Sequence, residues 1–291
     1  MIDLHIHSKY SDGDKTIKEI LEMCEQKKLE YISITDHNTC RQYEDEEFKN
    51  NSIFKGKIIK GVEMNAIFQN KKIEILGYNI KNPKIIEEWS EKFFAESILR
   101  EEQEKTRKKL LDICDKKGLI YDESKIEKNI ALTDYISIYI HKELMRHKEN
   151  YEILGEFTSL NCFVRKGVLN PESDYYGIED NTKGPMYKDV IDVIHKAGGL
   201  AFLAHPFEYR FNDTINFIDE LRKEKELDGI ECFHPSSEDS NKDKILFDYA
   251  RKNNLYISGG SDYHGNKKPD IEIGIGKGSL NIFKQLIEEW I

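Results

Sequence analysis

The feature that most constrains the fold of this 291-residue chain is a series of short β-type runs that end in histidine or a carboxylate. The first run, MIDLHIH, alternates apolar residues with Asp3, His5 and His7. A period of two is typical of a strand with one buried face. Later runs of this kind are YISITDH, KIIKGVE, KIEILGY, GLAFLAHP, DGIECFHP and LYISGGSDYH. We therefore expect about seven strands.

Helical segments separate many of these runs. Apolar periodicity predicts helices over residues 16–28, 187–197, 214–225 and 239–253, and a last helix from about residue 281. Thr16 and Glu19 have the spacing of a capping box, and Gly198-Gly199 is a helix stop. Strands that alternate with helices indicate mainly parallel strands in a βα barrel or an open sheet.

The strand pattern disappears between about residues 82 and 184. Residues 87–117 predict a long charged helix with at most one break, and IALTDYISIYIHKELMRHK predicts another helix. Because this region has apolar periodicity, we interpret residues 83–184 as an inserted, mostly helical subdomain. Residues 1–82 and 185–291 would then form the domain that carries the site.

Composition excludes several classes of protein. A net charge of −10 argues against a duplex-DNA binder, which usually has a strongly basic face. Five scattered cysteines without a CxxC motif predict free thiols in a reducing compartment. No apolar run approaches the ~18–20 residues that span a bilayer, and no signal peptide precedes the first strand. We expect a cytoplasmic protein with no membrane partner.

Imidazoles and carboxylates at the carboxyl ends of barrel strands would converge on one face. Carboxylates packed together raise each other's pKa values unless cations neutralise them. Imidazole with carboxylate suits zinc, manganese or iron, and about four to six ligands per ion imply two or three metals. The predicted ligands are His5, His7, Asp12, His37, Glu63, Glu74, His205, Asp262 and His264.

The segments DLHIHSKYSDG, ITDHNT, GVE, AHP and GGSDYHG resemble, in order and spacing, the PHP (polymerase and histidinol phosphatase) family. The similarity covers the whole chain, with looser agreement in the insert. The chain looks most like bacterial PHP phosphoesterases with an inserted helical domain, which act on nucleoside monophosphates, 3',5'-bisphosphates or short oligonucleotide ends. The resemblance implies a distorted (β/α)7 barrel and a trinuclear metal centre.

The resemblance also assigns ligands to each ion. His5, His7, Glu63 and Asp262 would hold the first metal; Glu63 would bridge to a second metal, completed by Glu74 and His205; Asp12, His37 and His264 would hold the third. The family usually has histidine where this chain has Glu74, a harder and more negative ligand. A solvated strand residue is the alternative for Glu74. The Arg-x-His pair that relatives carry is absent from IALTDYISIYI, so the usual substrate contacts are not predicted there.

The predicted function is hydrolysis of a phosphomonoester of a nucleotide or a similar small molecule. A metal-bridging water, with its pKa lowered toward ~7, would attack phosphorus while the metals neutralise the phosphoryl charge. The candidates for the catalytic groups are His205, His234 and Asp262, with His205, His234 or a water on the third metal as proton donor. Basic residues that could hold the substrate phosphate are Arg165, Lys166, Arg210 and Lys267.

Three alternatives stay open. The same metal centre could act on nucleic-acid ends, as an exonuclease or an RNA-processing enzyme, with a basic, aromatic groove in the insert. It could be a histidinol phosphatase, although those relatives usually lack such an insert. It could also be a non-catalytic, regulatory metal-binding module, a reading motivated by Glu74 and by the missing Arg-x-His pair.

Overall fold

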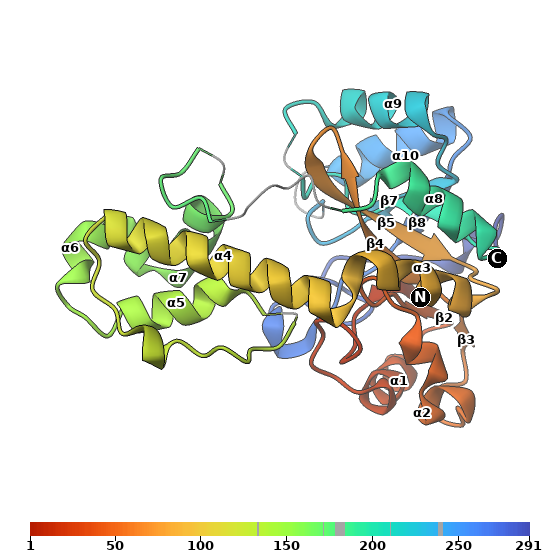
Figure 1. Cartoon of the computed structure of the whole chain (residues 1–291). Coiled ribbons are helices and arrows are strands. Elements are labelled where there is room, and N and C mark those ends of the chain that lie inside the picture. The colour runs from red at the N-terminus through yellow and green to blue at the C-terminus, as the bar shows by residue number, and fades with distance from the viewer. Residues whose placement is uncertain (133, 171, 178–183, 210, 238–240) are drawn as a thin grey trace. The chain divides into compact units, whose positions relative to one another are not determined.

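The computed structural model describes residues 1–132, 134–170, 172–177, 184–209, 211–237 and 241–291 (Figure 1). The chain divides into two compact units. The first comprises Met1–Phe93 and Thr182–Ile291, and the second comprises Phe94–Asn181. Within the described ranges, no helix is long and apolar enough to cross a membrane.

The first unit is a mixed α/β fold with two sheets. Three parallel strands form one sheet in the order β1 (Ile2–Ile6), β2 (Tyr31–Ile34) and β3 (Lys57–Ile58). The other sheet has the order β4 (Val62–Phe68), β5 (Lys71–Tyr78), β6 (Leu200–Leu203), β7 (Gly229–Phe233) and β8 (Tyr256–Gly259). Strand β5 is antiparallel to both neighbours, whereas β6, β7 and β8 are parallel.

The expectation of mainly parallel strands is confirmed, and β5 is the exception among the described strands. Gln69 and Asn70, the two residues between β4 and β5, have φ angles of 48° and 60°. Two successive residues with positive φ form the tight turn of a two-residue hairpin, and such a hairpin makes its strands antiparallel. The chain therefore returns directly along β4 instead of crossing over through a helix.

The two sheets meet through single bridges, and the described residues form eight strands rather than a continuous seven-stranded barrel. One bridge joins Ile6 of β1 to Tyr263, just beyond β8, and the other joins His37, beyond β2, to Glu63 of β4. Backbone hydrogen bonds from His7 N to Tyr263 O (2.9 Å) and from Asn38 N to Glu63 O (2.7 Å) accompany them. These links bring the histidines and carboxylates at the ends of β1, β2 and β8 close to Glu63 of β4.

Helices cover the sheets at the predicted positions. They are α1 (Ile17–Gln26), α8 (Tyr187–Lys196), α9 (Thr214–Glu224) and α10 (Lys242–Lys252). A short helix α2 (Glu46–Lys49) was not predicted. The capping box at the start of α1 is confirmed: Glu19 N donates to Thr16 Oγ1 (3.2 Å), and Thr16 N donates to Glu19 Oε2 (2.8 Å). Helix α8 packs on β4, β5 and β6, and α10 packs on β7 and β8.

The predicted helix after residue 281 is wrong. That segment contains only a short 3₁₀ turn, Lys284–Leu286. Its backbone joins the sheet instead, because Ile2 N donates to Ile282 O (3.0 Å). Trp290 Nε1 donates to Ile257 O (3.0 Å), and its ring packs against Tyr78. Tertiary contacts therefore override the helical periodicity here.

The second unit contains helices joined by turns and loops in the residues that the structure describes. Helix α3 (Pro83–Phe94) belongs to the first unit except for its last residue, and α4 (Glu96–Lys116) lies in the second. The break between them falls at Ala95, whose ψ of 146° is extended. The later helices are α5 (Ile136–Leu144), α6 (Asn150–Leu154) and α7 (Leu160–Cys162), so the helix predicted in IALTDYISIYIHKELMRHK is shorter than expected. This unit has its own apolar core, with Leu110, Ile140 and Phe163. The domain boundaries at residues 83 and 184 stay a prediction.

Candidate metal centre

All nine residues predicted as ligands lie in the first unit, and each is at ion-pair distance from at least one other. They come from strands and loops far apart in the sequence. His5, His7 and Glu63 are no more than 1% exposed. Such a concentration of buried imidazoles and carboxylates is costly unless the charges are paired.

Glu63, near the start of β4, is a buried carboxylate surrounded by imidazoles. Its Oε2 lies 3.2 Å from His5 Nε2, 3.2 Å from His7 Nε2 and 3.3 Å from His37 Nδ1. Its Oε1 lies 2.9 Å from His205 Nε2. One carboxylate therefore faces four imidazoles, with its two oxygens turned to different partners.

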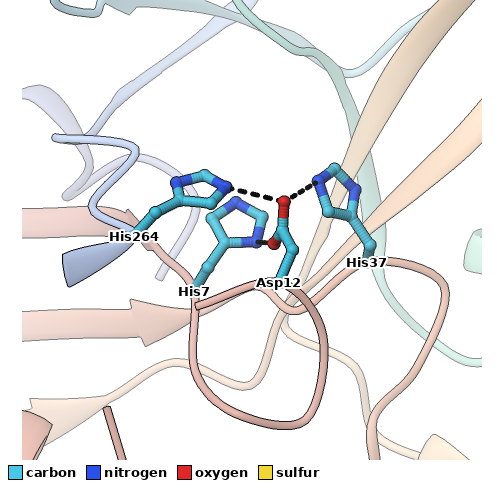
Figure 2. A group of neighbouring side chains, drawn as sticks. All are labelled: His7, Asp12, His37 and His264. Atoms are coloured by element: carbon cyan, nitrogen blue, oxygen red, sulfur yellow. Dashed lines mark hydrogen bonds and ion pairs between the residues drawn. The ribbon is translucent and has the colours of Figure 1, made fainter. Parts of the chain in front are cut away.

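Asp12, in the loop after β1, organises a second group of side chains (Figure 2). Its Oδ2 lies 3.1 Å from His264 Nε2 and 3.7 Å from His37 Nε2, and its Oδ1 lies 3.3 Å from His7 Nδ1. Asp36 supports this loop, because its carboxylate accepts hydrogen bonds from Ser8 N (2.8 Å) and Ser11 Oγ (2.6 Å). The loop thereby holds Asp12 beside the three imidazoles.

Asp262 divides its two oxygens between different neighbours. Its Oδ1 faces His7 Nε2 at 3.3 Å and His5 Nε2 at 3.5 Å. Its Oδ2 faces His234 Nε2 at 3.3 Å and pairs with the ammonium of Lys268. One oxygen thus points to the predicted ligands and the other to a histidine and a lysine.

Two predicted ligands have a backbone conformation that residues other than glycine seldom adopt. His205 has a φ of 22° and Asp262 a φ of 54°. Such residues persist where the surroundings over-determine them, and they concentrate at functional sites. Asp262 N donates to His5 O (2.8 Å). Gly260 makes this approach feasible, since a Cβ there would lie 2.3 Å from His5 N.

Glu74 lies in the middle of β5, opposite Asn65, and not at the end of a strand. Its carboxylate is 3.3 Å from His205 Nε2 and 3.9 Å from His37 Nδ1. Burial and the nearby charge of Glu63 raise the pKa of Glu74. Two carboxylates that crowd each other in this way are a setting that a divalent cation would stabilise.

Burial and charge oppose each other at the imidazoles. Burial lowers the pKa of His5, but Glu231, Glu63 and Asp262 outweigh it and raise the pKa well above 6.5. The pKa of His7 is also raised, against the effect of burial, by Asp12, Asp262 and Glu63. His205 follows the same pattern: burial lowers its pKa, but Glu63 and Glu74 raise it to about 9. The raised pKa values favour protonated rings in the absence of metal, and a cation that binds these nitrogens competes with the protons.

Four overlapping groups could each hold a metal ion, because their donor atoms lie within 4.8 Å of one another. They are His7–Asp12–His37–His264, His5–Glu63–His205, His5–His7–Asp262 and His37–Glu63–Glu74. The donor set of imidazole nitrogen and carboxylate oxygen fits zinc, manganese or iron. Glu63 belongs to two groups, as expected of a bridging ligand.

Two supporting residues were not predicted from the sequence. Glu231 of β7 is fully buried, and its Oε1 lies 2.8 Å from His5 Nδ1. The alternation of apolar and polar residues in GIECF could have indicated that the side chain of Glu231 points inward. From the segment DGIECFHP, only His234 was predicted to have a role. Lys268, which pairs with Asp262, lies next to the predicted Lys267.

The four residues predicted to hold phosphate lie in different parts of the chain. Arg165 and Lys166 belong to the second unit, where Lys166 Nζ lies 2.8 Å from Glu156 Oε2. Arg210 lies outside the described residues. Lys267 is exposed. Lys268 instead has its ammonium at the cluster.

Comparisons with known proteins agree with this arrangement. The PHP domain family matches residues 3–256. A phosphoribosyl 1,2-cyclic phosphate 1,2-diphosphodiesterase from Eggerthella lenta is 27% identical over 90% of this chain and 94% of its own. The 5'-3' exoribonuclease Rnm of Escherichia coli is 26% identical over 94% of this chain and 87% of its own.

Solved structures share the fold. A protein from Bifidobacterium adolescentis assigned to the metal-dependent phosphoesterases superposes with a TM-score of 0.68 at 20% identity, over 99% of this chain and 94% of its own. An amidohydrolase from Chromobacterium violaceum superposes with a TM-score of 0.66 at 22% identity, over 92% of this chain and 88% of its own. At these identities the similarity concerns the fold alone.

Proposed function

The chain belongs to the PHP domain family of metal-dependent phosphoesterases, and we propose that it hydrolyses a phosphomonoester of a nucleotide or a similar small molecule. It is a hydrolase of phosphoester bonds. The observation that carries the proposal is Glu63, a buried carboxylate that faces the imidazoles of His5, His7, His37 and His205 at 2.9 to 3.3 Å. An interior of this composition is suited to holding more than one cation.

Two or three divalent ions, manganese, zinc or iron, would be held by the nine residues predicted from the sequence. When bound, they supply positive charge to the phosphoryl oxygens and lower the pKa of a water molecule. Glu63 would serve two ions, because its oxygens face different imidazoles. Asp12, His37 and His264 would serve a further ion, together with His7 (Figure 2).

The other polar groups of the site have complementary roles. Lys268 places an ammonium beside Asp262, where it can hold a phosphoryl oxygen of the substrate. His234 is our candidate for the proton donor to the leaving oxygen, because it is not one of the predicted metal ligands, whereas His205 is such a ligand and its Nε2 contacts both Glu63 and Glu74. His234 Nδ1 lies 2.8 Å from Ser236 Oγ, which orients the ring.

Cleavage of a phosphodiester at an RNA end is the second candidate function. It is favoured by the relatives named as 5'-3' exoribonucleases in Escherichia coli and Haemophilus influenzae. Their alignments cover 94% and 99% of this chain, and so extend into the helical second unit. The cyclic diester named for the Eggerthella lenta relative is a third substrate to compare.

The test begins with protein that has been stripped by a chelator and reloaded with manganese. We expect bound metal and turnover of p-nitrophenyl phosphate, both lost in Asp262→Ala. Asp270→Ala, which changes an exposed aspartate of the same segment, should keep both. A protein that binds no metal, or that is indifferent to Asp262→Ala, would contradict the proposal.

The substrate class is tested by comparing the rates at which the protein hydrolyses three compounds under the same conditions. A nucleoside 5'-monophosphate, a 5'-phosphorylated RNA oligonucleotide and a ribose cyclic phosphate represent the three candidates. Preference for the monophosphate supports our proposal. Preference for the oligonucleotide would assign the second function.

A further inference from the structure

Glu231 is a buried carboxylate at the metal centre that belongs to none of the candidate ligand groups. It lies in the middle of β7, in register with Ser258 of β8. Its two oxygens have different partners. Oε1 lies 2.8 Å from His5 Nδ1, and Oε2 accepts a hydrogen bond of 2.8 Å from His205 N.

The contact between Glu231 Oε1 and His5 Nδ1 determines which ring nitrogen of His5 is available to a metal. An ionised carboxylate only accepts hydrogen bonds, so His5 Nδ1 must carry the hydrogen. His5 Nε2 then faces the centre, at 3.2 Å from Glu63 Oε2 and 3.5 Å from Asp262 Oδ1. Histidines that bind metal usually donate their other ring N–H to such an acceptor, which fixes the tautomer and the orientation of the ring.

The second contact acts on the backbone. His205 has a φ of 22°, a conformation that costs energy for a residue other than glycine. The hydrogen bond from His205 N to Glu231 Oε2 supports this conformation from the buried side. His205 Nε2 then meets Glu63 Oε1 at 2.9 Å. One carboxylate therefore links two histidines that are 200 residues apart in the sequence.

We propose that Glu231 is a positioning residue of the metal centre, which presents His5 to a metal through Nε2 and holds the backbone of His205 in place. This inference rests on the metal centre of the proposed function. It does not depend on which phosphoester is hydrolysed.

The chain contains a matched control for this arrangement. Asp228, three residues earlier, also accepts a hydrogen bond from a backbone N–H of the β6 strand, Ala201 N at 2.7 Å, and contacts a histidine, His195 Nε2 at 2.6 Å. His195 belongs to none of the candidate ligand groups. Asp228→Asn and Glu231→Gln thus each replace one carboxylate oxygen by an amide NH2 group. Both partners of Asp228 contact its Oδ2, whereas those of Glu231 are divided between its two oxygens, and of the two carboxylates only Glu231 touches the centre.

The experiment measures the affinity of both variants and the unchanged protein for Mn²⁺ and Zn²⁺, by competition with a chelating dye. We expect Glu231→Gln to weaken binding by about 10- to 100-fold, because the amide must turn a donor toward one of its two partners. Asp228→Asn should stay within about twofold. The proposal would be overturned if Glu231→Gln bound the metals as tightly as the unchanged protein, or if both variants lost metal affinity equally.

A second measurement needs no variant and decides the matter if Glu231→Gln does not fold. Nitrogen NMR of the unchanged, histidine-labelled protein should show His5 with hydrogen on Nδ1 and with Nε2 shifted when Zn²⁺ is added. Zinc bound through Nδ1 of His5 would refute the role of Glu231. Because both assays use metals without a substrate, absence of phosphoesterase activity would count against the proposed function and leave the positioning role standing.

Discussion

Removing the metals should make the protein progressively less stable as the pH rises from 6.5 to 9. His205 gives the clearest reason, because its buried ring lies against Glu63 and Glu74, which raise its pKa to about 9. In the metal-free folded state this ring keeps its proton over the interval, whereas the unfolded chain, with a histidine pKa of about 6.5, releases it. The folded state then binds more protons, and the free energy of unfolding falls with increasing pH.

The magnitude follows from the two pKa values. A difference of about 2.5, at about 1.4 kcal/mol for each pKa unit, gives a loss of about 3 kcal/mol from His205. The stabilisation is complete below pH 6.5 and is gone above about pH 9. His5 and His7, whose pKa values are also raised, act in the same direction.

Denaturation by urea at several pH values tests this reasoning. The chelated protein should show a falling free energy of unfolding between pH 6.5 and 9, and the manganese-loaded protein a much smaller change, because the metal replaces the proton. His205→Gln should reduce the slope, while His195→Gln, at a half-exposed histidine outside the centre, should leave it unchanged. A free energy of unfolding that is constant or rises with pH in the chelated protein would refute the argument.

Three further predictions concern single residues of the centre. Glu63→Gln removes the carboxylate that four imidazoles share; elemental analysis should find at least one ion fewer per chain, and turnover should fall by on the order of 100-fold or more. Glu74→His removes a crowded negative charge and should tighten Zn²⁺ binding by roughly tenfold in a dye competition; turnover found only in this variant would instead favour a regulatory module. Lys268→Met should raise KM roughly tenfold with a smaller effect on kcat, whereas Lys267→Met should change neither; equal effects would deny Lys268 its role at the phosphoryl group.

Local signals in the sequence were sufficient for much of the first unit. The helices α1, α8, α9 and α10 follow from apolar periodicity and end signals, since these act within a few residues of one another. The motif residues were assembled as predicted, because strands that end in imidazoles and carboxylates lie beside one another in the fold. His5, His7, Asp12 and His264 illustrate this: the first and last motifs of the chain meet at Asp12.

Other features depend on contacts that the sequence does not encode locally. The C-terminal segment has helical periodicity, yet its backbone hydrogen-bonds to β1. One local feature was also missed: the two-residue turn at Gln69 and Asn70 reverses β5 and places Glu74 in mid-strand. Lys268 pairs with Asp262, a contact that its place beside the predicted Lys267 did not indicate.

The sequence by itself determined the kind of chemistry, because imidazole and carboxylate donors are a property of residue type and of their order in the motifs. Only the tertiary structure decided how each donor is held. Glu231 has no motif of its own, and its importance comes from two contacts of 2.8 Å to His5 and His205. Such contacts join residues distant in the chain, and their geometry is set by strand register and packing, which no local pattern contains.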